Sequence, residues 1–78
     1  MMYSNDEELK KLFGKRLKQL RKEYKLSQSE LSALANIDKG SLQRIERGYN
    51  STLKTFRKLA NAFDISLSEL FNFQEEKK

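Results

Sequence analysis

The segment "LSQSELSALANIDKGSLQRIERG", residues 26–48, holds two short helical patterns joined by a turn. The spacing of its apolar residues predicts helices at residues 28–35 and 39–47. Asn36 stands where the chain must reverse, and asparagine tolerates the positive φ that suits such a reversal. Helices of two or three turns are not stable alone. We therefore expect this pair to pack together and against a larger helical body.

The local chemistry at the helix starts supports this assignment. Ser27 can accept a hydrogen bond from the backbone N–H of Glu30, and the Glu30 side chain can bond back, which makes a capping box. Leu26 can pack on Leu31 as a hydrophobic staple. Related signals predict three further helix starts: Asp38 with an Ile37–Leu42 staple, Thr52, and a second capping box of Ser66 and Glu69 with an Ile65–Leu70 staple.

Apolar residues recur at intervals of three and four on both sides of this stretch, from Leu9 to Tyr24 and from Leu53 to Phe63. This spacing places one apolar stripe on each of two further helices. Proline, valine and tryptophan are absent, whereas leucine, lysine, glutamate and serine are abundant, which favours helix. We predict an all-α fold with helices at residues 6–24, 28–35, 39–47, 53–63 and 67–72.

The length of the chain limits its organisation. Because 78 residues can close only one hydrophobic core, we expect one domain over residues 1–78, with a core in about 6–73 and a frayed tail at 74–78. Cysteine and histidine are absent, which removes disulfides, the usual zinc ligands and the commonest general base. We expect no metal and no cofactor. The sequence shows no signal-peptide core and no apolar run of about 20 residues, which predicts a cytoplasmic protein with no membrane partner.

The positive charge is unevenly distributed along the chain. Residues 9–58 carry a net charge of +10, whereas the whole chain carries +5. Such a segment can be a solvated lysine-rich surface or can bind a polyanion such as nucleic acid. Charge alone does not separate these two interpretations.

The second short helix carries its long polar side chains on one side. Leu42 and Ile45 face the core, so helical spacing directs Lys39, Gln43 and Arg44 to the other faces. Each of the three could serve solubility alone. Together they form a polar helix projecting from a basic body, which is how a helix-turn-helix presents a reading helix to the major groove.

Two long segments carry a resemblance to a known family. "FGKRLKQLRKEYKLSQSELSALANIDKGSLQRIERG", followed by "LKTFRKLANAFDISLSELF", resembles the lambda repressor-like, or xenobiotic-response-element (XRE), helix-turn-helix family. The resemblance runs from about Phe13 to Phe71. It implies a compact five-helix DNA-binding domain whose second and third helices form the helix-turn-helix.

The resemblance also implies roles for individual residues. Lys39, Gly40, Gln43 and Arg44 match the base-reading face of the family's recognition helix, where Gly40 would allow close approach to the DNA backbone. Lysine and arginine suit O6 and N7 of guanine, and glutamine suits N6 and N7 of adenine. The remaining matches are phosphate contacts at Gln28, Asn50, Ser51, Thr52 and Lys54, and a structural salt bridge between Arg21 and Glu46. Tyr49 could stack on a sugar, although we favour a place in the core.

The chain departs from the family pattern at four positions. Glycine is common where Lys25 ends the first helix and where Asn36 makes the turn. Alanine is common at Ser32, and proline near Ser51. Lys25 is the least favourable replacement because a positive φ costs a non-glycine residue on the order of 1 kcal/mol.

The C-terminal segment is densely apolar. Its apolar residues are Ile65, Leu67, Leu70, Phe71 and Phe73. They could cap the core of their own chain, or they could form a self-complementary interface for a twofold dimer. We predict a homodimer through the last helix, which would place two recognition helices about 34 Å apart on an inverted-repeat operator.

Two classes of function follow from these features. The first is a sequence-specific, double-stranded DNA-binding transcriptional regulator, such as a phage-type repressor or a restriction–modification controller. The alternative is a protein-interaction module, an antitoxin or adaptor with weak or no specific DNA binding. RNA polymerase or another protein is a further candidate partner. We do not expect an enzyme, because no nucleophile has a plausible base beside it and most acidic residues are used in helix caps.

Overall fold

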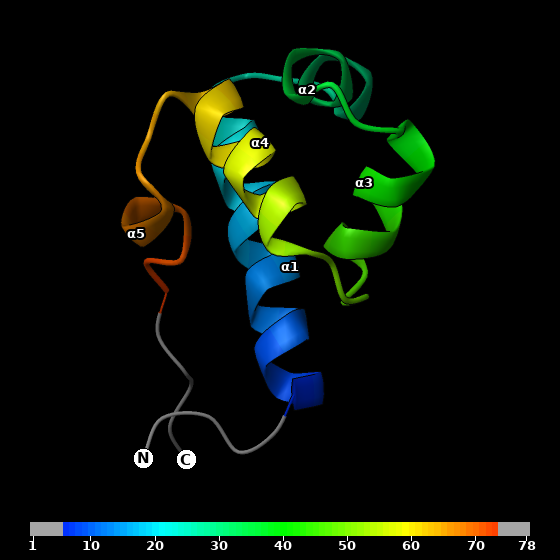
Figure 1. Cartoon of the computed structure of the whole chain (residues 1–78), viewed down its shortest axis with the longest axis vertical. Helices are drawn as coiled ribbons and strands as arrows, with labels where there is room; N and C mark the ends of the chain where they lie inside the picture. The colour runs from blue at the N-terminus through cyan, green and yellow to red at the C-terminus, as the bar shows by residue number, and fades with distance from the viewer. Residues whose placement is uncertain (1–5, 74–78) are drawn as a thin grey trace.

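The computed structural model describes residues 6–73 and contains helices and no strand within them. The five helices are α1 (Asp6–Glu23), α2 (Gln28–Ala35), α3 (Lys39–Glu46), α4 (Leu53–Phe63) and α5 (Leu67–Leu70). This confirms the predicted all-α fold and the order of its elements (Figure 1). The expected tail at 74–78 lies outside the described residues. Between residues 6 and 73, no helix is long and apolar enough to cross a membrane.

Three helices end one to two residues before their predicted ends. The residue after each last helical residue satisfies its N–H by bonding back into the final turn: Tyr24 bonds to Leu20 O at 2.9 Å, and Arg47 to Arg44 O at 3.0 Å. α5 ends at Leu70 rather than at residue 72. The bond from Tyr24 spans four residues, as in a regular α-helix, whereas the bond from Arg47 spans three and tightens the last turn of α3, which is a common way to satisfy the final carbonyls of a helix.

All four predicted caps are formed. The side-chain oxygens of Ser27, Asp38, Thr52 and Ser66 each accept the backbone N–H three residues later, at 3.0 to 3.2 Å. The capping box at Ser27 is complete, because its own N–H donates to Glu30 Oε1 at 2.8 Å. For the second predicted capping box, the bond from Glu69 N–H to Ser66 is formed, but the predicted return bond from the Glu69 side chain was wrong. The Glu69 carboxylate binds Arg16 of α1, at 3.1 Å, instead of reaching back to Ser66.

The three tightest connections repeat one arrangement. α1, α2 and α4 are each followed by a residue in the left-handed region, namely Lys25, Asn36 and Asp64 with φ of 57° to 58°. The next residue then donates its N–H to a carbonyl five positions back, from Leu26 to Arg21, Ile37 to Ser32 and Ile65 to Ala60. This is the Schellman closure. The same apolar residues are the predicted staples of the following helices, so one residue both closes a helix and positions the next.

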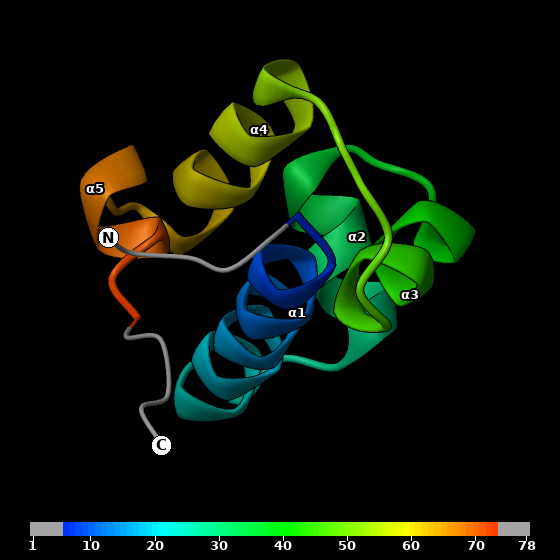
Figure 2. The same cartoon turned by 90° about the horizontal axis from the view of Figure 1, so that it is seen from below.

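The core lies around α1, which is buried along one side by the other four helices (Figure 2). Phe13 of α1, Phe56 of α4 and Phe71 after α5 form an aromatic cluster with ring centroids 5.1 to 5.2 Å apart. Two residues of the predicted apolar stripes lie at helix ends and stay exposed, Tyr24 at 45% and Leu53 at 74%. Figures 1 and 2 both place α3 and α5 on opposite sides of the molecule, with α1 and α4 between them.

Gly14 sets how closely α1 approaches α3. A Cβ atom at this position would lie 2.7 Å from the carbonyl oxygen of Glu46 and 2.9 Å from that of Ile45. Both distances are too short for a real contact with backbone atoms. The absence of a side chain at Gly14 therefore allows the backbones of α1 and α3 to meet, and so fixes where α3 stands.

Candidate nucleic-acid interface

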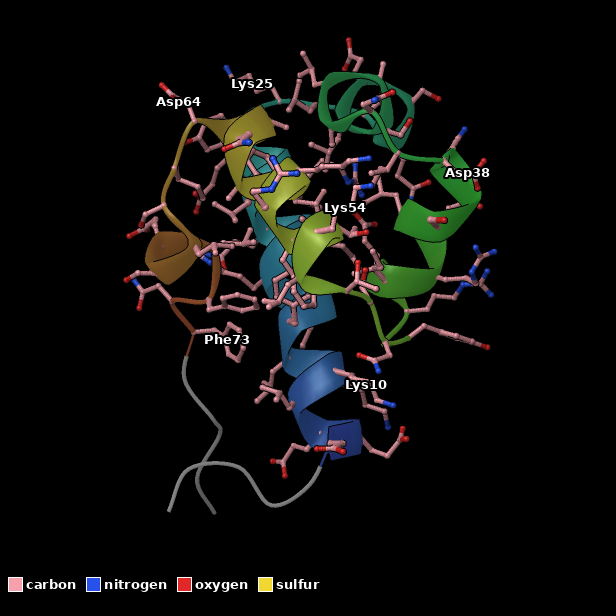
Figure 3. All side chains as sticks on the ribbon, viewed as in Figure 1. Lys10, Lys25, Asp38, Lys54, Asp64 and Phe73 are labelled. Carbon is pink, nitrogen blue, oxygen red and sulfur yellow. The ribbon has the colours of Figure 1, made fainter. Side chains whose placement is uncertain are left out.

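The α2–turn–α3 unit presents α3 at the edge of the molecule, as the sequence predicted. Leu42 and Ile45 are buried, at 0% and 3% exposure, and attach α3 to the body. Lys39 and Arg44 are exposed on its other faces, and Gln43 is half-buried beside α2. Figure 3 shows Asp38, the cap of α3, at the outer edge of the structure. α3 thus presents two exposed cations to a partner, and the Gln43 amide beside them is held by Gln28.

The exposed face of α3 is organised by short-range contacts. Arg44 Nη2 donates to Ser41 Oγ at 3.2 Å, which keeps the guanidinium along the helix surface. Asp38 Oδ2 accepts the N–H of Ser41 at 3.1 Å. A Cβ at Gly40 would lie 2.9 Å from that same Asp38 oxygen. Gly40 therefore has a reason within its own chain to lack a side chain, besides the close approach to DNA that the resemblance implies.

Arg21 and Glu46 form the salt bridge that the resemblance implies. Arg21 Nε lies 2.8 Å from Glu46 Oε2, and its Nη2 lies 3.2 Å from Oε1, so the contact is bidentate. The Glu46 side chain is only 3% exposed and that of Arg21 17%. Arg21 Nη1 also donates to the carbonyl of Leu26 at 3.1 Å. The pair joins α1 to α3 and to the entry of α2.

Gln28 continues this network toward the reading face. Its Nε2 donates to Glu46 Oε1 at 3.0 Å, and its Oε1 accepts from Gln43 Nε2 at 3.3 Å. The side chain is half-buried. Gln28 is therefore bound at both ends of its amide within the chain, and a phosphate contact would have to use its second N–H.

The segment between α3 and α4 holds the other predicted phosphate ligands. Asn50 Oδ1 accepts the N–H of Ser51 at 2.9 Å, and Thr52 Oγ1 caps α4 through Thr55 N. Lys54 is exposed on the first turn of α4, and Figure 3 labels it there. Tyr49 is 58% exposed, so the preference for a core position was wrong. The helix start at α4 combines open backbone donors with a nearby cation, an arrangement that favours anions.

The predicted interface residues of the C-terminal segment fall into two groups. Leu70 is fully buried at 0% exposure, so its side chain belongs to the core and offers no surface to a partner. Phe71 packs in the aromatic cluster and is half-buried, as are Ile65 and Phe73. Leu67 is 40% exposed. Leu70 is therefore removed from the predicted dimer interface. The residues that stay candidates for it are Ile65, Leu67, Phe71 and Phe73.

Sequence reasoning missed two links that hold α3 and α5. The first is the pair of bonds through Gln28. The second is Arg16, 8% exposed, whose Nη2 donates to both the backbone oxygen and the carboxylate of Glu69, at 2.8 and 3.1 Å. A signal for Arg16 existed, because helical spacing places it beside Phe13 and Leu20 on the apolar stripe. The link through Gln28 had no comparable signal.

Comparisons with known proteins agree with this geometry. A family model described as helix-turn-helix matches residues 17–70. Over 58 residues the chain is 41% identical to the immunity repressor protein of Bacillus phage phi105, an alignment that covers 73% of this chain and 40% of the repressor. The chain therefore spans less than half the length of that relative.

Two solved structures are similar over most of the chain. The restriction–modification controller protein C.AhdI from Aeromonas hydrophila matches with a TM-score of 0.76 and 40% identity, covering 78% of this chain and 94% of that one. The biofilm master regulator SinR, solved in complex with DNA, matches with a TM-score of 0.71 and 35% identity, covering 77% and 98%.

Proposed function

This chain belongs to the lambda repressor-like (XRE) helix-turn-helix family of DNA-binding transcriptional regulators, and we propose that it reads a specific duplex sequence through α3. This proposal rests on the way α3 is held, with one side packed against the body and the other exposed to solvent. Its buried side is fixed by Gly14 and by the Arg21–Glu46 pair, while Lys39 and Arg44 remain exposed. A well-supported helix with exposed cations suits base recognition in a major groove. The matched relatives are named as regulators, which supports a function that is not enzymatic.

Affinity and specificity are assigned to different residues in this proposal. Lys39 and Arg44 would read guanines, and Gln43 an adenine, with about 1 to 3 kcal/mol of discrimination for each good bidentate pair. The start of α4, with Asn50 to Lys54, would bind phosphates and set the position of α3 without reading sequence. The net charge of +10 over residues 9–58 would add sequence-independent attraction. A DNA partner implies the cytoplasmic location that the sequence predicts.

We further propose a twofold dimer through the side of the molecule that carries α5. Figure 3 shows Asp38 at the start of α3 and Phe73 beyond α5 on opposite sides. The middle extent of the chain is 21 Å, so a twofold axis beside α5 would separate the two α3 helices by at most ~40 Å, which accommodates the ~34 Å of one helical turn. Dimers of this kind read inverted repeats. Sedimentation of a monomer at micromolar concentration, with binding to a single half-site, would contradict this part.

One observation favours the alternative, a protein-interaction module. An apolar pocket of about 370 Å³ opens between the start of α1, the segment after α3 and the C-terminal segment, with Leu9, Phe13, Tyr49, Phe56, Phe71 and Phe73 in its lining. An antitoxin or adaptor could hold a partner's side chain there, as could a second copy of this chain. The surface of α3 does not require this pocket, so the two functions can be separated by experiment.

The proposal is tested by selecting binding sites from a random duplex pool with the purified chain. Affinity for the selected duplex and for a scrambled duplex is then measured over a series of salt concentrations. We expect an inverted-repeat consensus that binds at least about a thousandfold more tightly than the scramble. Weak binding of both duplexes that falls alike with salt would mean generic attraction only, and would favour the interaction module.

A further inference from the structure

Glu46, Gln28 and Gln43 form a chain of hydrogen bonds in which Gln43 donates to Gln28 and Gln28 donates to Glu46. Glu46 is an anion that can only accept hydrogen bonds, and Arg21 holds it in place with two of its donors. The neighbouring Gln28 must therefore turn its NH₂ group, not its carbonyl, toward Glu46 Oε1, and the two atoms lie 3.0 Å apart. The charge of Glu46 thus decides which way the Gln28 amide is turned.

The orientation of the Gln28 amide in turn determines that of Gln43. With its NH₂ group facing Glu46, Gln28 directs Oε1 toward α3, where it accepts from Gln43 Nε2 at 3.3 Å. This contact requires Gln43 to turn its own NH₂ group toward α2. The orientation of the Gln43 amide is consequently set by a carboxylate that it does not touch.

We propose that Gln28 is a positioning residue for sequence reading, which fixes the amide of Gln43 in one orientation before DNA is bound. This inference rests on the proposed function, since it assigns to Gln28 a part in base recognition. In the fixed orientation Gln43 keeps its carbonyl oxygen and one N–H for a base edge. Those are the acceptor and the donor that a bidentate contact with N6 and N7 of adenine needs.

A phosphate contact by Gln28 is the competing assignment, and it predicts a different result. A residue that binds phosphate supports every duplex equally, so its loss lowers the affinity for all duplexes by the same factor. A positioning residue supports only the base pair beneath the side chain that it orients. Its loss lowers the affinity only for duplexes that carry that base pair.

The test compares Gln28→Met with Ser29→Ala, an exposed neighbour on the same helix that serves as the control. Methionine keeps the length and the helix propensity of glutamine but cannot form either bond. The first readout is the NMR signal of the Gln43 side-chain amide in the free protein. We expect an ordered amide in the wild type and in Ser29→Ala, and a shifted, mobile one in Gln28→Met.

The second readout is affinity for the selected duplex and for versions altered at the base pair contacted by Gln43, at several salt concentrations. We expect Gln28→Met to reduce discrimination at that base pair by about three- to tenfold, which corresponds to ordering one flexible side chain. Gln28→Met should also add nothing in a Gln43→Ala background. An equal loss of affinity on all duplexes, and the same loss in the Gln43→Ala background, would overturn the proposal in favour of phosphate binding.

The NMR readout separates failure of this inference from failure of the proposed function. An unchanged Gln43 amide in Gln28→Met would overturn the positioning role whatever the protein binds. An ordered amide that depends on Gln28, in a protein that does not discriminate between duplexes, would instead refute the proposed function and the use of this contact in reading.

Discussion

The bond pattern around Glu46 predicts a large and specific loss of stability in Arg21→Met. The Glu46 carboxylate is 3% exposed and accepts two hydrogen bonds from Arg21 and one from Gln28. Methionine removes both bonds from Arg21 to Glu46 and, within residues 6–73, the one cation that pairs with the buried anion. Removing one partner of a buried pair costs about 3 to 5 kcal/mol. Domains of this size are stable by only about 4 to 12 kcal/mol, so the variant should lie close to unfolding.

Urea-induced unfolding followed by far-UV circular dichroism measures this loss. Because each 1 kcal/mol lowers the melting temperature of such a domain by about 4 to 8 °C, the thermal midpoint should fall by at least ~12 °C. Lys10→Met is the matched control, since it breaks the pair with Glu7, whose carboxylate lies on a side chain 75% exposed and so needs no partner in place of water. This control should cost less than ~1 kcal/mol, and high salt should erase its effect.

A second comparison separates the buried charge from the lost packing. Glu46→Leu added to Arg21→Met removes the uncompensated anion, so the double variant should be more stable than Arg21→Met alone. A cost of less than ~1 kcal/mol for Arg21→Met, or a double variant whose losses simply add, would show that the Glu46 carboxylate does not depend on Arg21 for compensation.

Three further changes have expected outcomes in the same unfolding assay. Lys25→Gly should raise the unfolding free energy by about 0.5 to 1 kcal/mol, because glycine relieves the positive φ of 58° at some cost in unfolded-state entropy, and a decrease would contradict that backbone conformation. Gly14→Ala should lower it by ~2 kcal/mol or more despite the better helix propensity of alanine, because its Cβ would meet two backbone oxygens of α3, and a stabilised variant would argue against this close approach. Leu70→Ala should lower the unfolding free energy by about 2 to 5 kcal/mol at every protein concentration, because Leu70 is fully buried. Leu67→Ala should instead alter only self-association, measured by sedimentation. The reverse pattern would indicate that Leu70 lies in a dimer interface.

The helix starts could be predicted from the sequence because the chemistry that fixes them is local. Each cap joins residues three positions apart, as at Ser27 and Thr52, and the residues between them leave few other geometries. The turn at Asn36 was predictable for the same reason, since its positive φ is a property of a single residue. Local rules therefore gave the order and the approximate bounds of all five helices.

Local rules failed where a distant residue competed for the same group. The Glu69 carboxylate satisfies the pattern of a capping box, yet it binds Arg16, which is 53 positions away in the sequence. The number of apolar residues near the C-terminus did not reveal which ones the core would bury, and Leu70 proved to be one of them. Packing decides both outcomes, and packing is not encoded in spacing along one segment.

In the candidate site, too, local spacing predicted some features and tertiary packing decided the others. The outward position of Lys39 and Arg44 followed from helical periodicity, and their roles in DNA reading stay predictions. The bonds that join Gln28 to Gln43 and Glu46 cross between α2 and α3, so they depend on the angle at which the two helices meet. The structure positions α3 by packing it against α1 at Gly14, and the spacing of residues within α2 and α3 carries no information about this contact.

A double-mutant cycle between Arg44 and its base pair tests whether α3 reads bases. Affinities of the wild type and of Arg44→Ala are measured for the selected duplex and for a duplex altered at the guanine assigned to Arg44. We expect the wild type to lose about tenfold or more on the altered duplex, and Arg44→Ala to lose less than about twofold, with unchanged folding. Equal losses for both proteins would show that Arg44 does not read this base, and would contradict the account.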